Sequence, residues 1–337
     1  MSPPPSSPGP AGGPEAARVE ALADCTEVLG TGVVPVAASD RERRRGVVYT
    51  FSAYLLWGVF PLYFLLLAPT GPWEIVAWRI ILSFVFCALL LTVTRTWPKL
   101  LAIVRQPRLL GWTAAAGVLI YVNWQTYLIG TLTGNVVETS LGYFINPIVT
   151  VLLGVLVLRE RIDVLQWVAI GIVVVAVIVS VVAYGDVPWI ALILAFSFGF
   201  YGLVKKRIGT AVDAVSGLTL ESFWLLPVAI VELIVVGMTS GLTIFGYGPW
   251  HAVLVLMAGV VTAVPLLLFA SGARRVPLTI VGLLQFITPI LQFLVGVAIL
   301  HEPMPPARWI GFGLVWIALI LLTVDSLRSV RRSRAAA

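Results

Sequence analysis

Two polar stripes recur in this sequence, 142 positions apart, inside otherwise apolar stretches. Each has the spacing i, i+3, i+7, which places three side chains on one face of a helix; they are Tyr143, Asn146 and Thr150, then Gln285, Thr288 and Gln292. Such groups either join helices through hydrogen bonds or line a cavity that holds a polar ligand. We favour a water-accessible cavity, because the stripe is present twice. Pro147 and Pro289 support this choice, since each frees a backbone carbonyl in the preceding turn.

The composition indicates a membrane protein. The 337 residues are 59% hydrophobic and only 11% charged, with a mean hydropathy of +1.01, whereas soluble domains carry roughly 25% charged residues. Cys25 and Cys87 have no CxxC or Cys/His neighbourhood, so neither a disulfide framework nor a metal site is expected.

Charged residues within the apolar stretches are the second group of candidates. Arg79 and Glu232 lie inside predicted helices, where a lone Arg or Asp costs about 2.5 to 3.5 kcal/mol at the bilayer centre. They either pair with each other or act separately, and we favour separate roles. Glu74 and Glu221 open the same two predicted helices, where a carboxylate suits the helix dipole. Helix capping is therefore their simplest role.

The candidate site residues are the members of these two groups together with Asn123. For substrate binding they are Glu74, Arg79, Asn123, Tyr143, Asn146, Thr150, Gln285, Thr288 and Gln292. Glu221 and Glu232 are candidates for coupling to a proton gradient, because burial of an unpaired carboxylate favours its protonated form.

Ten apolar segments must position these side chains, each close to the roughly 20 residues that span a bilayer as a helix. They are 46–68, 73–94, 110–130, 138–158, 165–184, 188–204, 217–238, 250–272, 278–300 and 307–325. Residues 1–45, rich in Pro, Gly, Ala and Ser, are expected to be a disordered cytoplasmic tail, and residues 326–337 a basic cytoplasmic tail. The sequence thus predicts an all-α membrane protein with ten transmembrane helices.

The basic residues predict the orientation. Lys and Arg occur before the first segment and after the second, fourth, sixth, eighth and tenth, while the opposite loops hold only Arg308. Because Lys and Arg are retained in cytoplasmic loops, both termini are expected in the cytoplasm. The net charge of +6 is then a topology signal, and no nucleic-acid partner is expected.

The sequence also repeats itself. The stretch 139–167 matches a second stretch 142 positions later without a gap, with identical residues at Pro147 and Pro289, Gly154 and Gly296, Glu160 and Glu302, and Trp167 and Trp309. Five segments per copy is an odd number, so the second copy would enter the membrane inverted. We therefore expect two inverted five-helix repeats, 46–184 and 188–325. This arrangement is typical of secondary transporters, with the substrate near the midplane.

Several motifs resemble one known family. They are Tyr54-Leu55-Leu56-Trp57-Gly58 with Pro61-Leu62-Tyr63, Glu74-Ile75 with Arg79, Ser140-Leu141-Gly142-Tyr143-Phe144-Ile145-Asn146-Pro147, and Leu158-Arg159-Glu160-Arg161. Over about residues 46–325 the chain is similar to the RarD proteins, in the EamA branch of the drug/metabolite transporter superfamily. The resemblance implies a ten-helix plasma-membrane carrier, linked by name to chloramphenicol sensitivity, whose substrate is poorly defined.

Other classes of protein fit less well. The two histidines, His251 and His301, belong to no HExxH motif, and no GxSxG motif occurs, so an enzyme, a metal site or a cofactor is not expected. The alternative is a non-transporting membrane protein for binding or signalling, which would need a soluble sensor or output domain. We expect a secondary-active carrier of small organic metabolites or drugs in the lipid bilayer. Proton or solute coupling and a homodimer are left open.

Overall fold

The computed structural model describes residues 40–158, 162–184, 187–273, 275–276 and 278–335. The chain forms two units, Met1–Arg43 and Arg44–Ala337. Of the first unit, only Asp40–Arg43 are described, as the beginning of a helix. The described part of the second unit contains helices and no strand.

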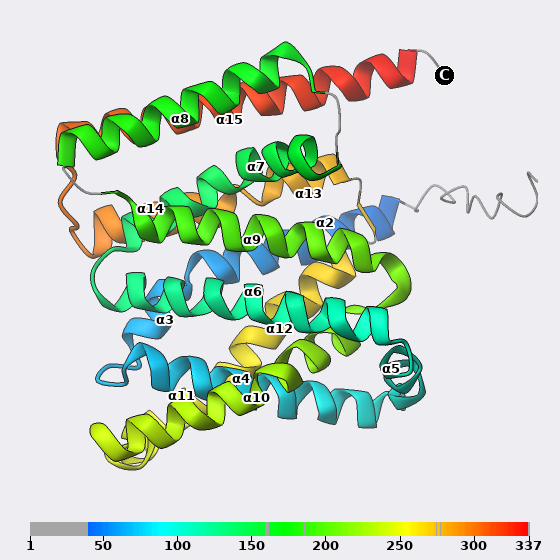
Figure 1. Ribbon diagram of the computed structural model, residues 1–337, viewed down its shortest axis with the longest axis vertical. Coiled ribbons are helices and arrows are strands. Elements are labelled where there is room, and N and C mark those ends of the chain that lie inside the picture. Colours follow the sequence, from blue (N-terminus) through cyan, green and yellow to red (C-terminus); the bar gives the residue numbers. More distant parts are fainter. Residues whose placement is uncertain (1–39, 159–161, 185–186, 274, 277, 336–337) are drawn as a thin grey trace, which may run out of the picture. The chain divides into compact units, whose positions relative to one another are not determined.

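The helices in chain order are α2 (Asp40–Gly58), α3 (Phe60–Leu65), α4 (Pro72–Val93), α5 (Trp97–Val104), α6 (Pro107–Leu132), α7 (Val136–Leu158), α8 (Val164–Tyr184), α9 (Trp189–Ile208), α10 (Ala214–Thr239), α11 (Gly248–Leu256), α12 (Ala258–Ala273), α13 (Leu278–Leu284), α14 (Ile287–Leu294) and α15 (Pro306–Ala335) (Figure 1). Short 3₁₀ turns, η1 (Gly209–Ala211) and η2 (Thr243–Phe245), flank α10, and the π-helical turn η3 (Val295–Ile299) follows α14.

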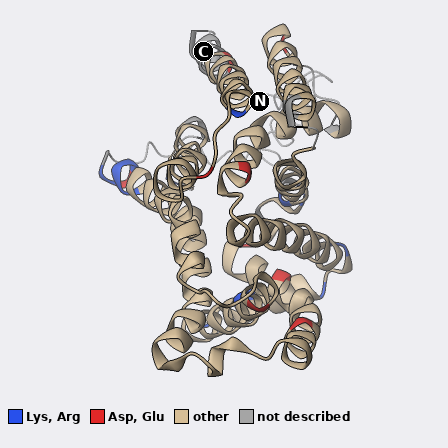
Figure 2. Ribbon diagram, turned by 90° about the vertical axis from the view of Figure 1, so that its left-hand side faces the viewer, with Lys and Arg blue, Asp and Glu red and all other residues tan. Residues whose placement is uncertain are grey.

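Six stretches in the described ranges are long and apolar enough to cross a membrane. They are Pro72–Val93, Val136–Val157, Ala214–Thr239, Gly248–Ala273, Ile280–Ile299 and Pro306–Asp325. Val164–Val179 and Trp189–Lys205 are shorter apolar stretches. The chain is therefore a multi-pass helical membrane protein. Viewed along the helices, most of the ribbon is coloured as uncharged residues, with few Lys, Arg, Asp or Glu positions (Figure 2).

Helix boundaries repeat along the chain. The starts of α4 and α10, of α7 and α13, and of α8 and α15 are each separated by 142 residues, the offset of the sequence repeat. Helices α4 and α10 pack together, as do α7 and α9, α6 and α9, and α8 and α15. Figure 1 shows α8 and α15 side by side along one edge.

Two glycines allow the backbones of neighbouring helices to approach closely. A Cβ atom on Gly142 of α7 would lie 2.7 Å from the carbonyl oxygen of Ala191 in α9, and one on Gly259 of α12 would lie 2.6 Å from the backbone of Leu82 in α4. In a membrane, the hydrophobic effect does not drive helices together, so their association depends on close packing. Small residues at these crossings allow that packing.

Prolines break two segments that the sequence predicts as continuous. Segment 46–68 is divided between α2 and α3, where Pro61 lacks the N–H that would bond the carbonyl of Trp57. Segment 278–300 is divided between α13 and α14, where Pro289 in the same way leaves the carbonyl of Gln285 without its helical partner.

Three helices begin or end beyond the segments expected from the sequence. Helix α2 begins at Asp40, so 40–45 is helical and not part of a disordered tail, and α15 continues through the expected basic tail to Ala335. Arg and Glu are good helix formers, which explains these extensions. Helix α10 begins at Ala214, with Asp213 as its N-cap accepting from the N–H groups of Val215 and Ser216. Glu221 thus lies two turns inside the helix and does not open it.

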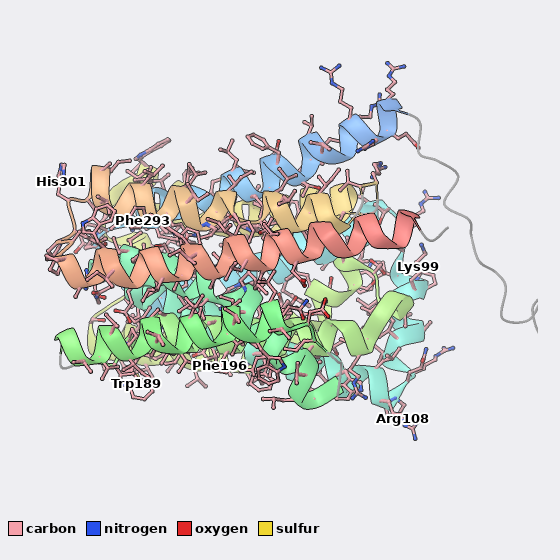
Figure 3. The ribbon with its side chains drawn as sticks, turned by 90° about the horizontal axis from the view of Figure 1, so that it is seen from above. Lys99, Arg108, Trp189, Phe196, Phe293 and His301 are labelled. Carbon is pink, nitrogen blue, oxygen red and sulfur yellow. The ribbon has the colours of Figure 1, made fainter. Side chains whose placement is uncertain are left out.

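The two ends of the helices differ in charge. Lys99 and Arg108 lie at one end and His301 and Trp189 at the other (Figure 3). We call the first the basic end, to which Arg275 also belongs because it shares a cavity with Lys99.

Candidate functional site

Arg79 is a buried cation surrounded by aromatic rings. Its side chain is only 4% exposed, and its Cζ atom lies 4.1 Å from the ring centroid of Trp124 and 5.5 Å from that of Phe64. Its Nε donates to Thr262 Oγ1 at 2.8 Å, while Nη1 has no hydrogen-bond partner. Among the described residues, no carboxylate forms an ion pair with this guanidinium.

Tyr143, which acts on this cation, also contacts Asn123. The Tyr143 hydroxyl donates to Asn123 Oδ1 at 3.2 Å, and Asn123 Nδ2 donates to the carbonyl of Leu194 and to Ser197 Oγ of α9. The phenol of Tyr143 interacts electrostatically with Arg79. These contacts hold α6, α7 and α9 together around one polar point.

Gln292 brings the second half of the chain to the same place. Its Nε2 donates to the Tyr127 hydroxyl at 3.3 Å and to the Trp57 carbonyl at 3.1 Å, while its buried Oε1 has no partner. The ring of Tyr127 packs on Phe64, and that of Tyr143 packs on Tyr127. We call Arg79, Asn123, Trp124, Tyr127, Tyr143 and Gln292 the central cluster.

Thr288 and Gln292 donate hydrogen bonds to backbone carbonyls near the break between α2 and α3. The Thr288 hydroxyl donates to the Tyr54 carbonyl at 2.8 Å, and Gln292 bonds the Trp57 carbonyl that Pro61 frees. Two of the three side chains of the second polar stripe therefore donate hydrogen bonds to backbone carbonyls of α2.

The remaining stripe residues lie outside the central cluster. The Thr150 hydroxyl donates to Asn146 Oδ1 at 3.1 Å, and Thr150 is exposed. Gln285 is half-buried, and within the described ranges its side chain makes no hydrogen bond. The structure thus brings Tyr143 and Gln292 into the central cluster, and the other stripe residues lie outside it.

Glu232 and Arg79 do not pair. Glu232 Oε1 accepts from the Tyr121 hydroxyl at 2.5 Å, and its Oε2 has no partner. Glu221, which lies 142 residues after Arg79, forms an ion pair with Lys205 at 2.8 Å and accepts from the Tyr201 hydroxyl. The two carboxylates therefore have separate surroundings.

Three other carboxylates bind backbone N–H groups at the end opposite the basic end. Glu74 accepts from the N–H of Thr243 at 3.0 Å, and also from the Thr243 hydroxyl and the N–H of Ile244. Glu302 binds the N–H groups at the start of α7, and Glu138 binds those at the start of α9. We call this the clamped end. Glu74 lies here, and not in the central cluster.

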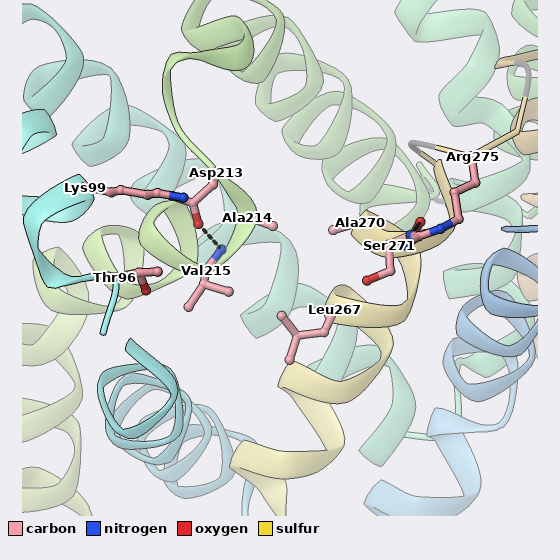
Figure 4. Close-up of a pocket in the computed structure, with 9 residues that line it drawn as sticks. All are labelled: Thr96, Lys99, Asp213, Ala214, Val215, Leu267, Ala270, Ser271 and Arg275. Carbon is pink, nitrogen blue, oxygen red and sulfur yellow. Dashed lines mark hydrogen bonds between the residues drawn. The ribbon is translucent and has the colours of Figure 1, made fainter. Parts of the chain in front are cut away.

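A cavity of about 510 Å³ lies at the basic end (Figure 4). Figure 4 shows Lys99 and Asp213 on one side of it and Ser271 and Arg275 on the other. It lies between α5, the start of α10 and the end of α12. The basic end thus contains a cavity, whereas carboxylate hydrogen bonds join the segments at the clamped end.

Sequence reasoning missed most neighbours of Arg79. Thr262 is 183 positions away along the chain, and helical periodicity relates only residues within one helix. Trp124 and Tyr127 read as ordinary core aromatics. Within the described ranges, no three His, Cys, Asp or Glu side chains gather as metal ligands.

The apolar helices and the buried polar cluster define a multi-pass membrane protein, and comparison with known proteins gives its family. The EamA-like transporter family model matches residues 44–182 and again 187–324. The chain therefore belongs to the EamA-like transporter family.

Its relatives are named as RarD proteins or as uncharacterized transporters. The chain is 46% identical to Protein RarD of Streptomyces exfoliatus, covering 88% of this chain and 94% of that protein. It is 42% identical to the uncharacterized transporter YojE of Bacillus subtilis, covering 87% and 98%. A solved structure described as "Crystal structure of protein" aligns with a TM-score of 0.52 at 17% identity, covering 84% and 98%, and shows a shared fold.

Proposed function

We propose that this membrane transporter is a secondary carrier of small organic molecules that works by alternating access. One observation carries the proposal: the central cluster joins side chains from both matched halves and lies in a protein hollow at one end and clamped at the other. Midplane sites between repeats are typical of such carriers.

The membrane arrangement is part of the proposal. Ten helices form two inverted repeats, 46–184 and 188–325, in the plasma membrane. The basic end faces the cytoplasm, as the retention of Lys and Arg there favours, and both termini are cytoplasmic. The family model's two matches, which divide between residues 182 and 187, support the duplication.

The candidate residues then take different roles. Arg79, Asn123, Tyr143 and Gln292 contact the substrate. Asn146, Thr150, Gln285 and Thr288 support the helices around it, and Glu74 belongs to the outer clamp. Glu221 and Glu232 remain candidates for coupling to a proton or solute gradient. A homodimer is compatible with this scheme.

The clamps at the outer end would open when the inner cavity closes. Opening must break the contacts of Glu74 with Thr243 and of Glu302 with Val136, because each joins segments far apart in the chain. Backbone N–H groups left buried without a partner cost about 1 to 3 kcal/mol each, so water must enter as the clamps separate.

Uptake by reconstituted protein tests the function. Proteoliposomes of the full chain are incubated with an isotope-labelled metabolite extract, and trapped compounds are identified by mass spectrometry against protein-free vesicles. We expect at least one small organic compound to enter only with the protein. If no compound does so with any imposed ion gradient, the chain is not a carrier of this kind and the binding or signalling alternative stands.

A further inference from the structure

The central cluster contains a positive charge with no negative partner in the described part of the chain. Arg79 is 4% exposed, and its contacts there are one threonine hydroxyl and aromatic rings. Removing a cation from water costs several kcal/mol unless a counter-charge or a full set of acceptors replaces the water. The protein alone therefore leaves this site electrostatically incomplete.

The aromatic rings leave the guanidinium's donors free. Arg has five N–H donors in the plane of the group, and a ring whose centroid lies 4.1 Å away, as in Trp124, attracts the charge through its face. Thr262 takes the Nε–H, and Nη1 stays unpartnered. A carboxylate is the partner that matches such a fork, through two parallel hydrogen bonds.

Neighbouring groups give the ligand a second feature. The rings of Trp124, Tyr127 and Tyr143 surround Arg79 or pack on one another near it. Flat groups pack favourably on such rings by offset or edge-to-face contact. Gln292 Oε1 adds one unused acceptor for a donor on the ligand.

The same cluster disfavours cationic ligands. Two buried carboxylates within the helices have other partners: Glu232 accepts from Tyr121, and Glu221 pairs with Lys205. The ammonium group of a cationic ligand would lie near the positive charge of Arg79, and the central cluster contains no carboxylate to bind it. Such a contact between like charges weakens binding.

We propose that the substrate is an organic anion with a flat apolar portion, its carboxylate held by Arg79 and its apolar portion among the cluster's rings. This rests on the proposed function and specifies its substrate class. Entry from the basic end fits the charge there, since the cavity carries Lys99 and Arg275 against one carboxylate, Asp213.

Ligand-induced thermal stabilisation of the purified full chain tests the class. The probes are indole-3-acetate, its neutral amide indole-3-acetamide and its amine tryptamine, with hexanoate as the carboxylate that lacks a ring. We expect indole-3-acetate to bind with a Kd about tenfold or more below those of the amide and the amine, as loss of a charge-assisted hydrogen bond predicts. Hexanoate keeps the carboxylate and should bind more weakly than indole-3-acetate because it lacks the ring contacts.

Substitutions locate the effect. Arg79→Gln should abolish the preference for the carboxylate, and Arg79→Lys should weaken it while keeping the order of ligands, because Lys binds as a point charge. Arg105→Gln, which removes an equal charge from an exposed position, should change nothing. If Arg79→Gln is unstable, Arg79→Lys alone decides: unchanged carboxylate binding overturns the proposal.

The outcomes separate this inference from the proposed function. Equal or tighter binding of the amide or the amine overturns the anion assignment, and so does metabolite uptake restricted to neutral or cationic compounds. In both cases transport itself would stand. Failure of every compound to enter the proteoliposomes would instead overturn the carrier function, and the substrate class with it.

Discussion

Glu302 Oε1 accepts the backbone N–H of Val136 at 2.6 Å, across 166 residues of sequence. Its other oxygen accepts from the N–H of Val137 at 2.8 Å. One carboxylate thus satisfies two of the free N–H groups at the start of α7, where a negative charge also suits the helix dipole. This contact joins the two matched halves of the chain at the clamped end.

Removing this carboxylate should destabilise the protein. Glu302→Ala leaves two buried N–H groups without acceptors, at about 1 to 3 kcal/mol each, so we expect a loss of several degrees in Tm. Glu302→Gln keeps one acceptor oxygen in the same shape and should lose less. Thermal unfolding of both variants in detergent measures this; equal losses would show that the hydrogen bonds do not hold α7.

The stability difference between wild type and Glu302→Gln should depend on pH. Burial raises the pKa of Glu302, although the N–H groups of Val137 and Val136 and the charge of Arg308 oppose this. A carboxyl with a raised pKa in the folded state stabilises the fold below its unfolded pKa, and that stability is lost as pH rises through the folded pKa.

Wild type should therefore lose stability relative to Glu302→Gln as pH rises above the reference Glu pKa of about 4.3. Glu138 and Arg308 are present in both proteins, so the difference reports on Glu302. A relative gain by wild type as pH rises would contradict the assigned direction.

Arg79 and Glu232 should contribute independently to stability. The two have different partners, Thr262 and Trp124 for Arg79 and Tyr121 for Glu232. In a double-mutant cycle with Arg79→Gln and Glu232→Gln, we expect the effects to add within about 0.5 kcal/mol. A coupling energy well above this would show that the residues pair in the membrane.

The proposed orientation predicts the outcome of reporter fusions. Fusions after Ala337 and in the loop at Arg105 should report the cytoplasm, and a fusion at Gly246 should report the outside. A cytoplasmic signal at Gly246 would reject the inverted-repeat arrangement and with it the assignment of the clamped end to the outer face.

The sequence predicts the positions of the helices better than it predicts the contacts between them. Apolar length and the 142-residue repeat place the starts of α4 and α10 near their observed positions, at Pro72 and Ala214. The sequence also predicts that Pro289 frees a backbone carbonyl. It does not predict that the helix divides near Pro289, because the interior Pro147 leaves α7 continuous. Tertiary packing decides between a kink and a break.

The site could be predicted only in part. Periodicity identifies Tyr143 and Gln292 as polar positions, and both join the central cluster. Periodicity does not separate these two residues from Thr288, which lies outside the cluster and donates to a backbone carbonyl of α2. Separating them requires knowing which helix packs against each residue. The acidic clamp at Glu302 was visible only as a residue shared by both copies, with no sign of its partner.

A reversible cross-link at the clamped end tests alternating access most directly. Thr70 and Thr243 are joined there by a 2.7 Å contact between hydroxyls, so Cys at both positions can form a disulfide once Cys25→Ser and Cys87→Ala remove the native thiols. In proteoliposomes, we predict that oxidation stops uptake of the transported compound and that reduction restores it, while each single-Cys variant is unaffected. Undiminished uptake by the fully cross-linked protein would contradict the account.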